Sequence, residues 1–341
     1  MNEQVLLRIN GQQWGGWTSV RIAAGIERVA RDFSVEITHG WPGYDAGDER
    51  PISVGDKVEV LIGDDPVMTG WIESTPLRYD ATAIGRTISG RSLTCDLIDC
   101  VAEPLQFREQ SLVQIARALA APFDVAVVNA GVPDTLLQGV QPSAGETVMA
   151  VLNKLLEQQQ ALAFDDAQGR LVLGRVGEQR ATTALVLGDN ILSGEATNSV
   201  SQRFSVYRVS GQRAGNDEDF GDATLTALQQ SASDAQITRY RPLMIRQTGN
   251  ATAASCQMRA NFEAQQRAAR SRQVTYRVQG WRQGDGQLWQ PNQQVIVWDP
   301  LLGFDNQPLL LAEVTFTLDT SGSKTTLTLA PPDAYLPAPA P

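Results

Sequence analysis

Alternating apolar and polar positions recur in two blocks of the chain, one near each end, and predict the same order of β-strands in both. The alternation covers residues 33–41, 52–60, 66–73 and 86–89 in the first block, and 274–281, 288–298, 308–316 and 325–329 in the second. Each block reads as a strand ending in Gly-Trp, a turn, a Val-x-Val strand, a loop and two more strands. Repeated units usually serve a symmetric assembly. We therefore predict a duplicated β-module; chance similarity between two β-rich segments is the alternative.

Between the two blocks the apolar spacing becomes helical. Residues 112–121 carry one helical pattern, and residues 147–160 carry another after a capping-box signature at Ser143 and Glu146. The turn-forming segment 165–169 then separates two short apolar runs, as in a β-hairpin. This stretch therefore predicts a small domain of mixed α and β structure.

Together these elements predict a mainly β fold with α+β insertions, built from two tube-like β-barrel modules, a small α+β domain and an accessory helical segment. A chain of 341 residues is too long for one ordinary core. The expected boundaries are 1–106 for the first barrel, 107–176 for the α+β domain, 178–240 with 273–332 for the second barrel, 241–272 for the inserted helical segment and 333–341 for a Pro-rich tail.

Composition narrows the possible environments and partners. No apolar run approaches the roughly 20 residues of a membrane-spanning helix, and no basic segment followed by an apolar stretch opens the chain, so we expect cytoplasmic synthesis and no membrane insertion. The formal net charge of −10 argues against a dedicated DNA-binding protein. Only three of the 28 basic residues are lysine, so 25 are arginine. That bias favours pairing at interfaces, although a biased genome composition explains it equally well.

Candidate chemistry is sparse. Neither a phosphate-binding P-loop nor a Gly-x-Gly-x-x-Gly turn is present, and the only histidine is His39 at a strand end. Cys95, Cys100 and Cys256 lack the spacing of a metal site and predict buried thiols. We therefore expect no catalytic residues, no metal and no cofactor.

Adjacent carboxylates are the remaining candidates for catalysis. Asp64 and Asp65 form one pair, and Asp165 and Asp166 form another. Glycosidase carboxylates face each other across a cleft, whereas adjacent acidic residues are typical of turns. These pairs therefore favour hairpin turns over an active site.

Two tryptophans near the N-terminus are candidate interface residues. Trp14 and Trp17 flank Gly15-Gly16 at a predicted junction between loop and strand. Exposed aromatic side chains there would suit a protein interface, and core filling is the alternative.

Several segments resemble Mu-type bacteriophage baseplate hub proteins. They are residues 90–99, which close the first β-module, residues 239–243 (Arg-Tyr-Arg-Pro-Leu) and residues 278–292. The resemblance extends over essentially the whole chain. It implies a homotrimer whose two tube-like barrels per chain form a pseudo-sixfold ring, related to the base of type VI secretion spikes. It brings no catalytic residues.

The expected function is therefore a structural hub of a contractile tail in the virion. The resemblance implies contacts with a tail tube or tube-initiator protein and a central spike, and possible contacts with tape-measure and wedge proteins. DNA would be passing cargo, and an acidic channel wall would not hold it. Asp64, Asp65 and Asp217 are the candidate channel-facing residues. The alternatives are a tail-associated cell-wall hydrolase, a type VI-like spike base and a distal tail protein.

Overall fold

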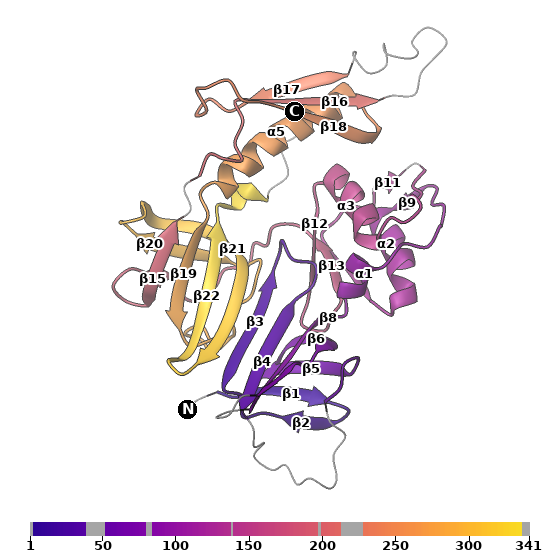
Figure 1. The fold of residues 1–341 in the computed structure, drawn as a ribbon. Coiled ribbons are helices and arrows are strands. Elements are labelled where there is room, and N and C mark those ends of the chain that lie inside the picture. Colours follow the sequence, from indigo (N-terminus) through magenta and orange to yellow (C-terminus); the bar gives the residue numbers. More distant parts are fainter. Residues whose placement is uncertain are drawn as a thin grey trace.

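The computed structural model describes residues 3–38, 52–79, 84–137, 139–196, 199–212 and 228–335 (Figure 1). The fold is mainly β. One extended sheet of 14 strands forms the body, and two three-stranded sheets and one two-stranded sheet accompany it. The apolar alternation of the sequence thus becomes strands with one face in a shared core.

The described residues of the first β-module form eight strands. They are β1 (Val5–Ile9), β2 (Gln12–Trp14), β3 (Ser19–Gly25), β4 (Asp32–Thr38), β5 (Lys57–Ile62), β6 (Asp65–Ser74), β7 (Leu77–Tyr79) and β8 (Ile84–Ser92). The second module comes mostly from the C-terminal part of the chain. It consists of β14 (Leu185–Val186), β15 (Ile191–Ala196), β19 (Val274–Gln279), β20 (Gln294–Asp299), β21 (Phe304–Asp319), β22 (Gly322–Ala330) and the 3₁₀ turn η2 (Pro332–Ala334).

The two modules pair their strands in the same order. The first runs β3-β4-β8-β6-β5, and the second runs β15-β19-β22-β21-β20, with every one of these neighbours antiparallel. Both also carry an irregularity at the same step: one lies between Ile72 and Ser74 where β6 meets β8, and the other between Leu311 and Glu313 where β21 meets β22. A β-bulge is a specific local feature, so its repetition supports the duplicated topology that the sequence pattern predicts.

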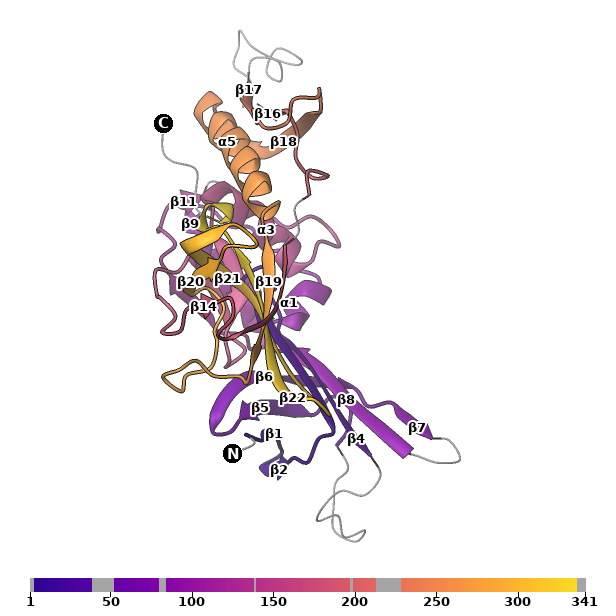
Figure 2. The same ribbon diagram turned by 90° about the vertical axis from the view of Figure 1, so that its left-hand side faces the viewer.

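The two modules are joined edge to edge. β3 pairs antiparallel with β21, and this pairing makes one continuous sheet of the two modules (Figure 2). A single apolar core includes residues of both, from Leu7 and Phe33 in the first to Tyr276 and Leu327 in the second. No sheet formed by the described residues closes into a barrel, so the predicted barrels are open sheets in the single chain. Trp41, the predicted partner of Trp281, lies outside the described residues.

The predicted α+β domain lies beside the first module. Its elements are α1 (Cys95–Asp99), β9 (Gln110–Ser111), α2 (Leu112–Ala120), the 3₁₀ turn η1 (Ala121–Phe123), β10 (Val127–Ala130), β11 (Leu136–Leu137), α3 (Val148–Gln159), β12 (Leu162–Asp165) and β13 (Leu171–Gly174). Ser111 caps α2 with a full capping box. The cap of α3 is Thr147, whereas Glu146 accepts from the backbone of Ser143 ahead of the helix.

A separate unit lies at the far end of the molecule from the first module (Figure 1). β16 (Val206–Gln212), β17 (Gln229–Ser233) and β18 (Pro242–Asn250) form a three-stranded sheet, and α5 (Ala253–Arg270) packs on it. The sequence prediction assigns the first two of these strands to the second barrel and the third to the helical segment. They instead pair with one another, because β16 takes β18 as a parallel partner across a long connection that sequence alternation does not record.

Candidate assembly surfaces

The junction between the modules is a fully paired strand edge. Ile22 lies opposite Phe316 and Val20 lies opposite Leu318 in the antiparallel register. Ile22 and Phe316 are buried in the shared core. At the end of the junction the backbones come close, because a Cβ on Gly25 would lie 2.9 Å from the carbonyl oxygen of Ala312. Glycine has no Cβ, so a glycine at this position permits the close approach.

Charged side chains cover the same junction. Arg28 donates to Glu313 at 3.2 Å, and Arg28 and Arg21 both contact Asp32. At the other end of the sheet, Arg282 of the second module contacts Glu3 and donates to Asp65 at 2.7 Å. These pairs are partly exposed, so each contributes modestly to stability, but they fix how the modules meet.

β15 and β7 are among the strands of the large sheet that keep an uncovered edge in the described residues. β15 pairs only with β19, and β7 pairs only with β8. Figure 2 shows β7 and the adjoining end of β8 extending away from the rest of the chain. Leu77 is 61% exposed, Tyr79 is 80% exposed, and Leu192 on β15 is 52% exposed. Unpaired edges with apolar side chains are sites at which another chain can add.

A buried ion pair docks the α+β domain on the first module. The carboxylate of Asp165, at the end of β12, accepts from the backbone N–H of Arg31 at 3.0 Å and from its Nε at 3.2 Å. Burial raises the pKa of Asp165, and the charge of Arg31 opposes that rise. Thr69 adds a hydrogen bond of 3.0 Å to the carbonyl of Ala167 in the same hairpin. The neighbouring Asp166 accepts from two backbone N–H groups of its turn, as adjacent acidic residues in hairpins commonly do.

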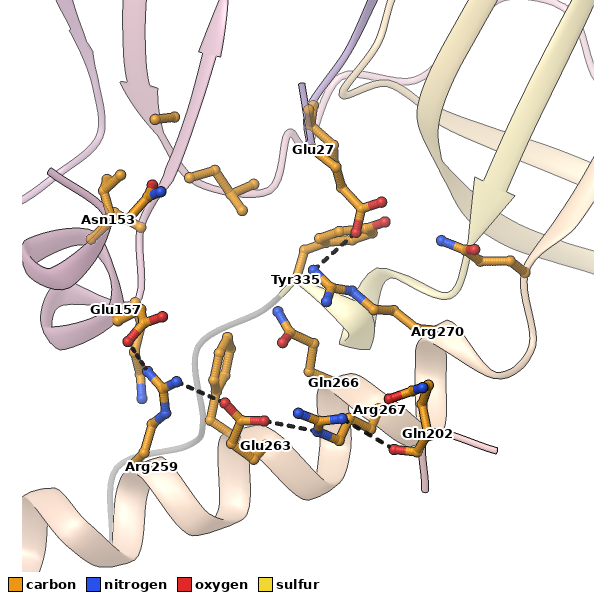
Figure 3. Close-up of a pocket in the computed structure, with 18 of the residues that line it drawn as sticks. Glu27, Asn153, Glu157, Gln202, Arg259, Glu263, Gln266, Arg267, Arg270 and Tyr335 are labelled. Carbon is orange, nitrogen blue, oxygen red and sulfur yellow. Dashed lines mark hydrogen bonds and ion pairs between the residues drawn. The ribbon is translucent and has the colours of Figure 1, made fainter. Parts of the chain in front are cut away.

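A groove with a volume of about 870 Å³ lies between α5 and α3 (Figure 3). A ladder of charges runs along α5: Arg259 donates to Glu157 at 3.0 Å and to Glu263 at 2.8 Å. Glu263 also accepts from Arg267 at 2.9 Å, and Arg267 donates to the carbonyl of Gln202 at 3.3 Å. Every carboxylate in this ladder is neutralised by arginine, which suits a clamp between domains rather than acid–base chemistry.

A further arginine–carboxylate pair lies at the other end of the groove. Arg270 donates to Glu27 of the first module at 2.9 Å, beside the buried ring of Tyr335 (Figure 3). Burial raises the pKa of the Tyr335 phenol. The ion pairs that line this groove therefore hold α5 against the α+β domain and the first module.

The residues singled out from sequence fall in different places. Trp14 and Trp17 are buried in the main core, which supports core filling; a role at an interface stays a prediction. Asp64 is exposed in the turn before β6, and Asp65 pairs with Arg282. His39 and Asp217 lie outside the described residues. Sequence reasoning missed Asp165 and Arg31 as a docking pair, since nothing local distinguishes them from turn and surface residues.

Burial covers two of the three cysteines. Cys95 and Cys256 are buried, Cys100 is half-buried, and all three are free. Burial is the main cause that raises the pKa of Cys95 to about 12, which keeps it a thiol. Within the described ranges no group of three or more His, Cys, Asp or Glu side chains could hold a metal ion. Among the same residues, no helix is long and apolar enough to cross a membrane.

Comparison with known proteins identifies the chain's relatives. Three family models match successive parts: the N-terminal domain of Mu phage baseplate assembly protein GpP-like proteins (residues 4–92), the second domain of gp44-like baseplate hub proteins (94–175), and the fourth domain of Mu phage baseplate assembly protein GpP (252–338). The baseplate hub protein gp44 of Escherichia phage Mu is 34% identical over 98% of this chain and 90% of its own length.

Solved structures agree. The 43 kDa tail protein of prophage MuSo2 from Shewanella oneidensis is 31% identical and superposes with a TM-score of 0.86, over 98% of this chain and all of that one. A component of the E. coli type VI secretion system shares the fold at 11% identity and a TM-score of 0.57, over 98% of this chain and 80% of that one. The chain thus belongs to the Mu-like phage baseplate hub proteins, which are structural components of the virion tail.

Proposed function

We propose that three copies of this chain form a ring in the baseplate that joins a sixfold tail tube to a threefold central spike. The repeated strand order supports the proposal most directly, because each chain carries two modules with the same β3-β4-β8-β6-β5 type of pairing. Three chains then offer six similar surfaces to a hexameric tube while keeping threefold symmetry toward a spike.

The partners follow from this arrangement. One face of the ring meets the tail tube or its initiator protein, and the opposite face meets the spike. Tape-measure and wedge proteins are further candidates at the periphery. The chain is made in the host cytoplasm before it joins the tail.

DNA passes through the ring without being held. The chain has an excess of acidic over basic residues, 38 against 28. A wall of carboxylates repels the phosphate backbone and leaves few reversible contacts to slow ejection. Asp64 suits such a wall better than Asp65, because Asp64 is exposed and Asp65 is engaged by Arg282.

The hub acts without catalysis in this proposal. A glycosidase that cleaves the cell-wall polymer needs two opposed carboxylates in a cleft. In the groove between α5 and α3, Glu157, Glu263 and Glu27 are instead paired with arginines of α5. These ion pairs hold the domains together.

The number of hub chains in an assembled tail tests the proposal. Cryo-electron microscopy or native mass measurement of purified tails should find three copies per baseplate, with both modules of each chain around the channel. Six copies per tail, or a ring in which only one module of each chain contacts the tube, would refute the adapter. Clearing of a peptidoglycan suspension by the purified chain would refute the proposal that the hub has no catalytic activity.

A further inference from the structure

We infer that β15 of one chain adds to the uncovered edge of β7 in a second copy of the same chain, and that this contact repeats the β3–β21 junction found within each chain. The inference rests on the proposed function, for which it supplies the interface between protomers. It is argued from the pairing registers of the two modules, which assign an equivalent to each strand of the junction.

β15 is the counterpart of β3. Phe33 in β4 corresponds to Val274 in β19. Phe33 lies opposite Gly90 of β8, which pairs with Ile72 just before the bulge in β6. Val274 lies opposite Leu329 of β22, which pairs with Leu311 just before the bulge in β21. Ile22 of β3 lies opposite Phe33, and Ala196 of β15 lies opposite Val274. Ala196 therefore occupies the position of Ile22.

β7 is the counterpart of the C-terminal half of β21. Leu77 of β7 lies opposite Arg86, and Phe316 of β21 lies opposite Thr325. Counting from the shared bulge, Arg86 and Thr325 are equivalent positions in β8 and β22. Leu77 therefore occupies the position of Phe316, which is where β21 receives β3.

The register between two copies follows from these equivalences. Within the chain, Ile22 faces Phe316, Arg21 faces Thr317 and Val20 faces Leu318. Transferred to the uncovered edges, Ala196 faces Leu77, Glu195 faces Arg78 and Gly194 faces Tyr79.

Charge and size favour this register independently of the symmetry. Glu195 and Arg78 are both exposed and make no ion pair within the described residues, and the register places these opposite charges across from each other. The exposed side chain of Leu77 lies across from the small residue Ala196, which leaves room for it. At Gly194 the ring of Tyr276 fills the space that a side chain would take, so Tyr79 packs against that ring in this register. Phe316, which occupies the position of Leu77 in the second module, is buried where β21 pairs with β3.

The contact uses two different surfaces, so it is heterologous and must close into a ring or grow into a filament. Each chain contains one such junction internally and forms another with its neighbour. Three chains then alternate internal and external junctions around six modules. With both kinds of junction sharing one geometry, the ring closes when each junction turns the next module by one-sixth of a circle.

A disulfide between the two edges tests the pairing. Opposed residues of an antiparallel pair have Cα atoms about 4.5 to 5.5 Å apart, within disulfide range. A Leu77→Cys, Ala196→Cys double variant, made with Cys100→Ser, should oxidise to covalent dimers and trimers and no larger species. Each single variant should give no cross-link, because neither edge faces its own copy.

Each outcome separates the inference from the proposed function. Trimers by native mass that give no cross-link in the double variant would overturn the edge pairing and leave the hub trimer standing. A ladder beyond the trimer would keep the pairing and refute the threefold ring. Cross-links in a single variant would overturn the pairing, since like edges would then meet.

Charge reversal gives a second test that needs no cross-linking. Arg78→Glu or Glu195→Arg alone should weaken self-association about two- to fivefold per contact, and the double reversal should restore it. Arg108→Glu and Glu178→Arg change exposed charges elsewhere and serve as matched controls with no expected effect. Additive weakening in the double reversal would contradict the register.

Discussion

Replacing Asp165 by alanine should destabilise the chain far more than its position in a hairpin suggests. The Asp165 side chain is fully buried, and its carboxylate accepts from the backbone and the Nε of Arg31. Removing one member of a buried ion pair costs about 3 to 5 kcal/mol, because the other charge is left uncompensated.

The structure indicates the lower end of that range. Arg31 keeps hydrogen bonds to the carbonyl oxygens of Val67, at 2.8 Å, and of residue 165, at 3.2 Å. Its backbone N–H also reaches the hydroxyl of Ser92 at 3.1 Å. We therefore expect Asp165→Ala to lower the free energy of unfolding by about 3 kcal/mol.

Urea unfolding followed by tryptophan fluorescence measures this loss, and Arg170→Ala is the matched control. Arg170 pairs with Asp166 in the same hairpin but is largely exposed, so its loss should cost less than about 1 kcal/mol. An Arg31→Ala, Asp165→Ala double variant completes a cycle, with a coupling of about 1 to 3 kcal/mol expected. An Asp165→Ala protein within about 1 kcal/mol of wild type, or strictly additive variants, would refute the docking role.

Two further predictions concern the strand junction and the carboxylate of Glu146 ahead of α3. Gly25→Val should destabilise the chain by about 1 to 3 kcal/mol, since the new Cβ would meet the carbonyl of Ala312. Gly85 has open space around it, so Gly85→Ala should be tolerated. Equal melting temperatures of the two variants would contradict the close approach at Gly25. The hydrogen bond from Lys154 lowers the pKa of Glu146, so its stabilisation is present above the ordinary glutamate pKa of about 4.3 and is lost as pH falls through the lower folded pKa. Glu146→Gln should thus melt slightly below wild type at pH 7, and the gap should close in acid; a gap independent of pH would refute this.

The parts of the fold that sequence predicts are those whose signals are local. The turn after Asp165 joins β12 to β13, as the residue types indicate, whereas the capping box predicted at Ser143 and Glu146 gives way to Thr147 as the cap of α3. The order of strands within each module also follows, because alternation and turn spacing recur in both. Period-two patterning fixes which face of a strand is buried.

Long-range pairing is what the sequence conceals. Alternation in β16 is compatible with any sheet, and its parallel partner β18 follows a long connection that leaves no local signal. The same holds for β3, whose partner is a strand almost at the other end of the chain. The docking pair Arg31 and Asp165 was missed for this reason, since two charges far apart in sequence carry no mark of their contact.

The pairing of β3 with β21 also sets a schedule for biosynthesis. Gly25 is made early, and its partner Glu313 leaves the ribosome 288 residues later. At about 5 to 20 residues per second, the edge of β3 waits roughly 15 to 60 seconds for its cover. During that interval an apolar, unpaired strand edge is open to other nascent chains. Expression yield should therefore depend on translation speed, temperature and chaperone supply, and C-terminal truncations that remove β21 should aggregate rather than accumulate as a soluble first module.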